Sequence, residues 1–134
     1  MANTITNTTL VNGSKKTIIY LAVDSDGSEE TDYVVYDSSA LATSAGKTDP
    51  LTCRLKHLKY AVASATAFIK LEFDATTDVL AMSIPAYAAG ELDFEEMGGL
   101  KNTAGTGITG DITLTTTGLA AGDSFVIILE VDRN

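Results

Sequence analysis

The chain has 134 residues, 45% of them hydrophobic, with a mean hydropathy of +0.14 and a formal net charge of −9 at pH 7. This length and hydrophobic content predict one folded domain with a packed core, and they exclude wholesale disorder. The acidic charge argues against nucleic acid or an anionic membrane as the main partner, because both bind clustered basic residues.

Cysteine usage and the N-terminal sequence indicate where the chain is made. Cys53 is the single cysteine, so no intrachain disulfide can form. The opening MANTITNTTLVNGSKK lacks the charged and then apolar regions of a secretory signal peptide. No apolar run approaches the roughly 20 residues that cross a bilayer. We therefore expect synthesis in a cytoplasm and no membrane partner.

The N-terminal part of the chain predicts strands separated by turn-rich loops. Residues 1–12 are rich in threonine and predict a first strand, either an edge strand or an extended arm. Asn12-Gly13 is a strong turn signal, and it predicts a hairpin into a strand over Lys15–Val23. The acidic loop Asp24–Asp32 comes next, followed by a short aromatic and β-branched strand at Tyr33–Tyr36.

The middle of the chain continues the same pattern after a long loop. Ser38–Pro50 is rich in small and polar residues, which predicts a surface loop. Thr52–Val62 predicts a strand, although the spacing of its apolar residues is irregular. Ala67–Phe73 alternates apolar and polar residues, which is typical of a half-buried strand. Val79–Ile84 predicts the next strand, and Pro85 should end it.

The C-terminal part predicts the strands that close the fold. Glu91–Met97 alternates and predicts a strand, and the glycine-rich Gly98–Gly107 predicts a loop. Asp111–Thr117 and Ser124–Val131 then predict a β-hairpin joined by small residues. Phe125–Leu129 holds five apolar residues without a break, which predicts a strand in the middle of a sheet that is buried on both faces.

These elements together predict an all-β fold. About eight or nine short strands at this spacing, with no long helix, favour a β-sandwich or barrel, and eight strands fit a jelly roll. No internal repeat or linker divides the sequence. We therefore expect residues 1–134 to form a single jelly-roll-like β-sandwich domain.

The acidic loop is the first candidate for a chemical site. Asp24–Asp32 concentrates carboxylates of the kind that bind a hard cation such as calcium. Its glycine, Gly27, falls at the fourth position, whereas an EF-hand loop needs glycine at the sixth. The ordinary alternative is a solvated turn, with Asp26-Gly27 supplying the left-handed conformation.

The only cysteine and the only histidine lie four residues apart, at Cys53 and His57. On a strand their Cα atoms would be roughly 13 Å apart, too far for a nucleophilic pair, and zinc would need several further ligands. We expect a buried thiol and a surface histidine. Because no nucleotide, metal or triad motif is present, we expect a non-enzymatic protein without a cofactor.

Arg54, Lys56 and Lys59 gather three of the nine basic residues into six positions. One interpretation is an ordinary solvated face. The other is an electropositive spot at a protein interface, which would bind an acidic partner surface or a further copy of this acidic chain. Neither aromatic interleaving nor an overall basic charge supports nucleic acid.

Several turn and strand signatures lie along the chain. They are MANTIT at 1–6, LVNG at 10–13, LEFD at 71–74, VLAMSIP at 79–85, GGL at 98–100 and GTGITGDITLTT at 105–116. In these segments the chain resembles small structural proteins of tailed bacteriophages, most naturally the head decoration or cement type. The resemblance implies a β-rich homo-oligomer, with a trimer favoured, that binds the major capsid protein on the outside of the head where capsomers meet. It implies the virion as the final location, after synthesis in the bacterial cytoplasm.

Two other classes of function fit a β-sandwich. A carbohydrate-binding or other ligand-binding module would need exposed aromatic residues on one face, whereas this chain has no tryptophan and five scattered tyrosines. A small enzyme of the cupin-like jelly-roll type would need a histidine-rich metal site, and the chain has one histidine. The ligand-binding module is therefore the main alternative to a capsid protein.

Overall fold

The computed structural model describes residues 3–12, 16–37, 53–101, 103, 107 and 109–133. Over these residues the chain forms ten strands and one short 3-10 helix, so the all-β prediction is confirmed. In this part of the chain no helix is long and apolar enough to cross a membrane.

The elements follow one another in this order. They are β1 (Thr4–Asn12), β2 (Lys16–Asp26), β3 (Tyr33–Tyr36), β4 (Cys53–Ala63), β5 (Phe68–Phe73), β6 (Val79–Ile84), β7 (Ala89–Asp93), η1 (Glu95–Met97), β8 (Leu100–Lys101), β9 (Ile112–Thr117) and β10 (Ala121–Arg133).

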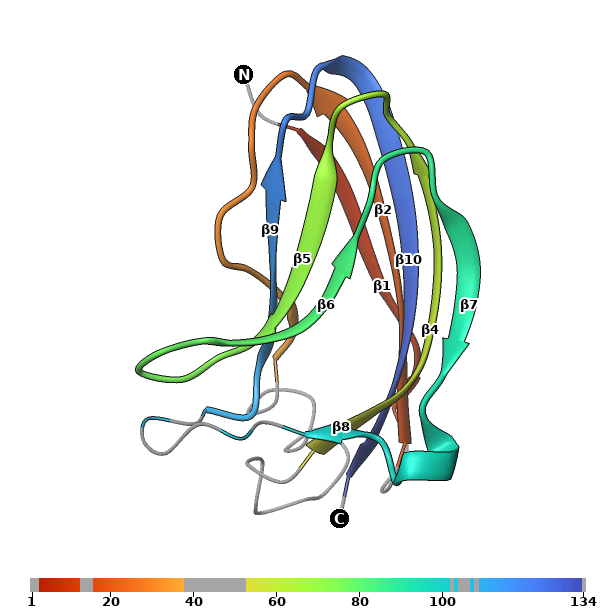
Figure 1. Cartoon of the computed structure of the whole chain (residues 1–134), viewed down its shortest axis with the longest axis vertical. Coiled ribbons are helices and arrows are strands. Elements are labelled where there is room, and N and C mark those ends of the chain that lie inside the picture. Colours follow the sequence, from red (N-terminus) through yellow and green to blue (C-terminus); the bar gives the residue numbers. More distant parts are fainter. Residues whose placement is uncertain are drawn as a thin grey trace.

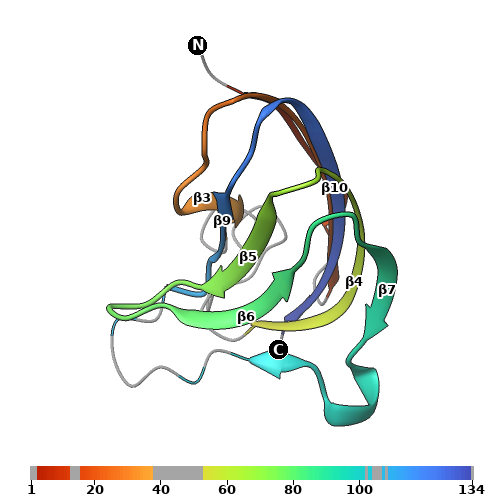
Figure 2. The same cartoon turned by 45° about the horizontal axis from the view of Figure 1, so that its top comes forward.

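The strands form two antiparallel sheets that face each other (Figure 1 and Figure 2). The large sheet has the order β1-β2-β10-β4-β7, with β8 pairing β4, and the small sheet has the order β3-β9-β5-β6. Eight of the strands pair as a rolled-up hairpin: β2 with β10, β3 with β9, β4 with β7 and β5 with β6. This winding is the jelly roll, so the jelly-roll prediction is also confirmed.

The core lies between the two sheets and is built from alternate residues of each strand. Buried side chains come from β2 (Ile19, Leu21, Val23), β4 (Leu55, Leu58, Val62), β5 (Ile69, Leu71, Phe73), β9 (Ile112, Leu114) and β10 (Phe125, Ile127, Leu129, Val131). Each fully buried aliphatic or aromatic side chain contributes about 1.5–3 kcal/mol through removal from water. The period-two alternation in the sequence therefore becomes one inner face per sheet.

β10 is the central strand of the large sheet, as its apolar run predicts, but the predicted burial on both of its faces is wrong. Ile127 and Leu129 are fully buried, whereas Val126 and Ile128 are only half-buried. An unbroken apolar run is typical of strands covered on both sides. In a two-layer sandwich only one face of each sheet meets the other sheet, so Val126 and Ile128 point outward.

The predicted C-terminal hairpin is also wrong, because β9 and β10 belong to different sheets. Gly118-Leu119-Ala120 carries the chain from one sheet to the other. The Glu29 carboxylate accepts hydrogen bonds from the backbone N–H groups of Gly118 and Leu119, at 2.6 and 2.8 Å. Asp123 accepts from the Ser64 hydroxyl and from the Ala120 N–H, at 2.7 and 2.9 Å. These carboxylates fix a crossover where two consecutive strands could otherwise pair.

Several predicted boundaries differ from the structure. The strand predicted over Glu91–Met97 is β7 at Ala89–Asp93, after which the chain turns through η1. The predicted Gly98–Gly107 loop contains β8, whose two residues help raise the count to ten strands. The strands are not uniformly short, since β2 and β4 have 11 residues and β10 has 13.

The N-terminal prediction of an edge strand is confirmed for Thr4–Asn12, which forms β1 and pairs antiparallel with β2 as the Asn12-Gly13 signal indicates. The strands predicted around Tyr33–Tyr36, Thr52–Val62 and Val79–Ile84 are confirmed as β3, β4 and β6. The predicted loop at 38–50 lies outside the described residues.

Adjacent isoleucines on β10 provide a matched test of this architecture. Ile127→Ala should lower the free energy of unfolding by about 2–5 kcal/mol, because it leaves a cavity in the core. Ile128→Ala should cost about 1 kcal/mol or less, because its side chain lies on the outer face. Urea unfolding with unchanged m-values measures both. Equal losses would contradict the assignment of the two faces.

Candidate protein interface

The outer face of the large sheet carries apolar side chains at its centre. Ile128 pairs with Tyr20 on β2 and with Lys59 on β4. Val126, two residues earlier, pairs with Ala22 and Ala61. Residues paired across antiparallel strands share a face, so these rows all point away from the core. We call this set the outer apolar face: Ile18, Tyr20, Ala22, Ala61, Ala89, Val126 and Ile128.

Three shallow depressions run along this face. The central one, of about 390 Å³, is lined in part by Lys59, Glu91 and Ile128. One of about 260 Å³ reaches Tyr87, and one of about 290 Å³ reaches His57. Neighbouring depressions share lining residues, so together they form one groove along β4 and β10. We call it the β4–β10 groove.

Tyr87 stands at one end of the groove in an uncommon conformation. Its φ is 50°, in the left-handed region that disfavours residues with a side chain, and its side chain is 75% exposed. The Tyr87 N–H donates to the carbonyl of Ser64 at 3.1 Å, which holds the backbone in place. Such a conformation costs about 1–3 kcal/mol, and residues with this strain tend to cluster at functional sites. An aromatic ring held at the rim of an apolar groove is a typical anchor of protein interfaces.

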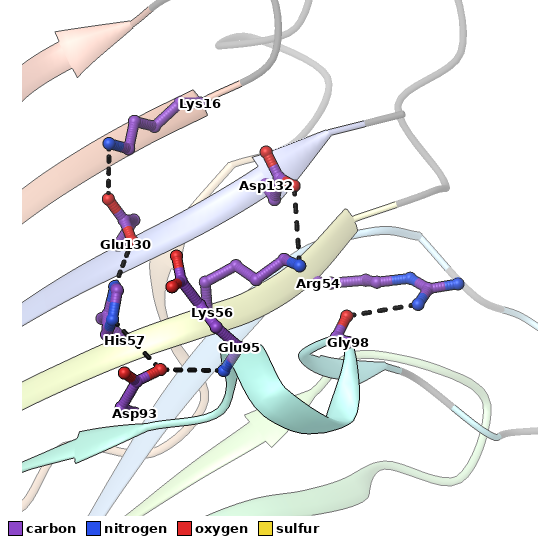
Figure 3. Close-up of polar contacts among 9 residues, drawn as sticks. All are labelled: Lys16, Arg54, Lys56, His57, Asp93, Glu95, Gly98, Glu130 and Asp132. Atoms are coloured by element: carbon purple, nitrogen blue, oxygen red, sulfur yellow. Dashed lines mark hydrogen bonds and ion pairs between the residues drawn. The ribbon is translucent and has the colours of Figure 1, made fainter.

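The other end of the groove holds a chain of charges that crosses four strands (Figure 3). Lys16 on β2 lies 2.8 Å from Glu130 on β10, and Glu130 also contacts Nδ1 of His57 on β4. Nε2 of His57 lies 3.1 Å from Asp93 on β7, and Asp93 accepts the backbone N–H of Glu95 at 2.8 Å. We call Lys16, Glu130, His57 and Asp93 the charge chain. Its neighbouring members carry opposite charges whenever His57 is protonated, so each charge of the chain then lies beside an opposite one.

The contacts shift the pKa values in a consistent direction. The hydrogen bond with Glu130, joined by the one with Asp93, raises the pKa of His57 against the opposing effect of burial. Burial acts to raise the pKa of Glu130, but the hydrogen bonds from Lys16 and His57 outweigh it and hold that pKa below its usual value. The Glu95 N–H and His57 lower the pKa of Asp93. Each shift favours the charged form of its group.

The three basic residues predicted as an interface share the outer face of the large sheet but have different partners. Arg54 donates to the carbonyl of Gly98 at 3.2 Å, and the ammonium of Lys56 lies 3.9 Å from Asp132 (Figure 3). Lys59 is exposed and lines the central depression. Their joint role as an electropositive interface therefore stays a prediction, and of the three only Lys59 belongs to the groove.

The acidic loop has a structural role in the fold. The Glu29 carboxylate binds the crossover described above, and Asp26 accepts the N–H of Ser28 at 3.0 Å. Asp32 lies close to Glu72 and Asp78, with one oxygen of each within 4.8 Å of the others. The calcium hypothesis for this loop stays a prediction.

His57 has a different environment from the one that the sequence predicts. Its side chain is 27% exposed and contacts two carboxylates, so it is a half-buried member of an ionic chain and not a free surface histidine. The Cys53 side chain lies outside the described residues. Glu130, Asp93 and Tyr87 could not be recognised as site residues from the sequence, since only the pairing of distant strands and the turn before β7 place them around the groove.

Comparison with protein-family models and with curated proteins finds no match to this chain. The functional interpretation therefore rests on the groove, its residues and the sequence resemblance.

The charge chain predicts a specific dependence of stability on pH. The pKa of His57 is higher in the folded chain than in the unfolded chain. The folded chain therefore binds a proton at His57 more tightly than the unfolded chain does. The resulting stabilisation is complete below the ordinary histidine pKa of about 6.5 and is lost as pH rises through the higher folded value. The free energy of unfolding should therefore fall with rising pH in this window, and His57→Gln should abolish the decrease.

Urea unfolding across this window measures the effect, and the single histidine gives one unambiguous NMR titration. A titration midpoint at or below the ordinary histidine pKa would contradict the geometry. So would an unchanged pH dependence in the His57→Gln variant.

Proposed function

We propose that this chain is a non-enzymatic structural protein that binds a protein surface through the β4–β10 groove. The observation that carries the proposal is the outer apolar face, with the strained and exposed Tyr87 at its rim. Contiguous apolar surface that remains open to water on a folded domain usually marks an interaction site. The opposite face of the same sheet forms the core, and the apolar side chains of the outer face are not part of that core.

The surface it binds is the outside of a tailed-phage head, where the chain acts as a decoration or cement protein. The sequence resemblance supports this assignment, and the jelly roll is compatible with it because capsid proteins use this fold. Lectins and cupins use the fold too, so the fold alone does not select a function. The partner is then the major capsid protein and the location is the virion, after the chain has folded in the cytoplasm of the bacterial host.

The chemistry of the groove suits a docking role. When a partner docks, the apolar surface at the centre of the groove is removed from water. This burial contributes about 25 cal/mol to the binding free energy for each Å² of apolar surface. When His57 is protonated the charges of the charge chain sum to zero, so docking leaves none of these four charges unpaired in the interface. Lys59 and Glu91, which pair across β4 and β7, add one charge of each sign to the groove lining.

Stabilisation of a head would come from many such contacts together. A homo-oligomer, which the resemblance implies to be a trimer, presents several grooves to neighbouring capsomers at once. The second and third contacts then form within one complex and gain from its high effective concentration. A modest affinity per groove is sufficient for tight binding to the head.

Matched substitutions on the two sheets test the docking face. Ile128→Glu places a carboxylate in the centre of the groove and should weaken binding to empty heads by at least tenfold, about 1.4 kcal/mol. Leu80→Glu alters a side chain that is 55% exposed on β6 of the small sheet, and it should bind as the wild type does. Cosedimentation with purified empty heads of the encoding phage, together with the melting temperature of those heads, measures both.

The possible outcomes test the docking face and the decoration function separately. Equal binding by both variants would show that the groove is not the docking face. If the wild-type protein neither bound the heads nor raised their melting temperature, the decoration function itself would be contradicted.

A carbohydrate-binding module is the second candidate, and Tyr87 is the observation that favours it. An exposed tyrosine beside an apolar groove offers a ring surface on which a sugar can stack. If this candidate is correct, a glycan array should show binding by the wild-type protein that Tyr87→Ala abolishes. An array without binding would dismiss it.

A further inference from the structure

β1 forms one edge of the large sheet, and its other side is open as far as the described residues go. It pairs with β2 from Thr4 to Asn12, and no other strand of the described residues pairs with it. Nine residues in extended conformation give an edge of about 30 Å. Along this edge backbone N–H and C=O groups are available to a further strand.

β1 is exposed along nearly its whole length. From Thr4 to Val11 only Ile5 is half-buried, and every other side chain is exposed. Leu10 and Val11 are 54% and 42% exposed, which is unusual for adjacent apolar residues. The Asn7 side chain donates to the carbonyl of Val35 at 3.2 Å and helps hold the strand in position. The edge is therefore ordered and ready for pairing.

The sequence of β1 lacks the charged residues and the proline that protect many edge strands. Natural edges carry lysine, proline or inward-pointing charges that prevent pairing with another chain. The segment TITNTTLVN contains no charged residue and no proline, and its one irregularity is a bulge between Thr9 and Val11. The opposite edge, β7, has five residues, carries Glu91 and Asp93, and ends against η1. The two edges of the same sheet therefore differ in their capacity to pair.

We propose that β1 pairs antiparallel with β1 of a second copy of this chain. Two chains of net charge −9 repel each other over most of their surfaces, and β1 is a long exposed segment where they can meet without opposing carboxylates. Antiparallel pairing of identical strands also satisfies a two-fold axis, the commonest symmetry of homo-oligomers.

The side chains of β1 are suited to antiparallel pairing with β1 of a second copy. Full overlap of the strand places Thr8 beside Thr8 of the second copy and Asn7 of each copy beside Thr9 of the other, within the regular part of β1 that precedes the bulge. Threonines that lie opposite each other form favourable cross-strand pairs. This contact is independent of the proposed function and needs no phage head. It joins two copies, whereas the resemblance implies three.

Charge reversal at Thr8 tests the contact in solution. Thr8→Glu and Thr8→Lys each place like charges opposite each other at the two-fold axis and should weaken self-association at least tenfold. An equimolar mixture of the two variants places opposite charges together and should restore dimers. Sedimentation equilibrium over a range of concentrations measures all three samples and the wild type. Thr77→Glu, at an exposed turn of the small sheet, is the control and should dimerise as the wild type does.

A disulfide trap gives an independent readout of the register. In a Cys53→Ser background, Thr8→Cys should form a covalent dimer under mild oxidation, and Thr77→Cys should not. A wild-type protein that stays monomeric at every concentration would overturn the proposal, and so would a trimer whose stability is the same in the Thr8→Glu variant. Because these measurements use the protein alone, their failure is distinct from a failure to bind heads.

Discussion

The fold depends on the pairing of β10 along both of its edges. This strand bonds to β2 on one side and to β4 on the other over most of its 13 residues. Its inward side chains, Phe125 to Val131 at every second position, supply the centre of the core. Its outward side chains, Val126 and Ile128, form the centre of the β4–β10 groove. The same strand therefore stabilises the domain with one face and offers an interaction surface with the other.

The charge chain links this central strand to the rest of the face. Glu130 extends from β10 and contacts both Lys16 on β2 and His57 on β4, and His57 continues to Asp93 on β7. Four strands of the large sheet are thus tied at the end of the groove in addition to their backbone ladder. The groove between this chain and Tyr87 is a surface held at both ends, which reduces the ordering that binding would require.

The sequence allowed the fold class to be predicted because strand alternation and turn chemistry are local signals. Asn12-Gly13 indicated the β1–β2 hairpin, and the regular alternation around Leu71 indicated β5 and its inner face. The crossover between β9 and β10 could not be predicted, since the Glu29 carboxylate that fixes it lies about 90 residues earlier. The partners of His57 were missed for the same reason, as Glu130 is 73 residues away. The apolar run of β10 could not show that one of its faces remains open.

Chemical labelling of lysines on the bound protein tests the central claim, which is that the outer face of the large sheet docks on a head. Lys59 lines the groove, and Lys70 lies on the small sheet; both side chains are exposed in the free domain. Acetylation rates of the two lysines, measured by mass spectrometry with and without empty heads, should show slower modification of Lys59 and an unchanged rate for Lys70. Protection of Lys70 with Lys59 unaffected would contradict the account.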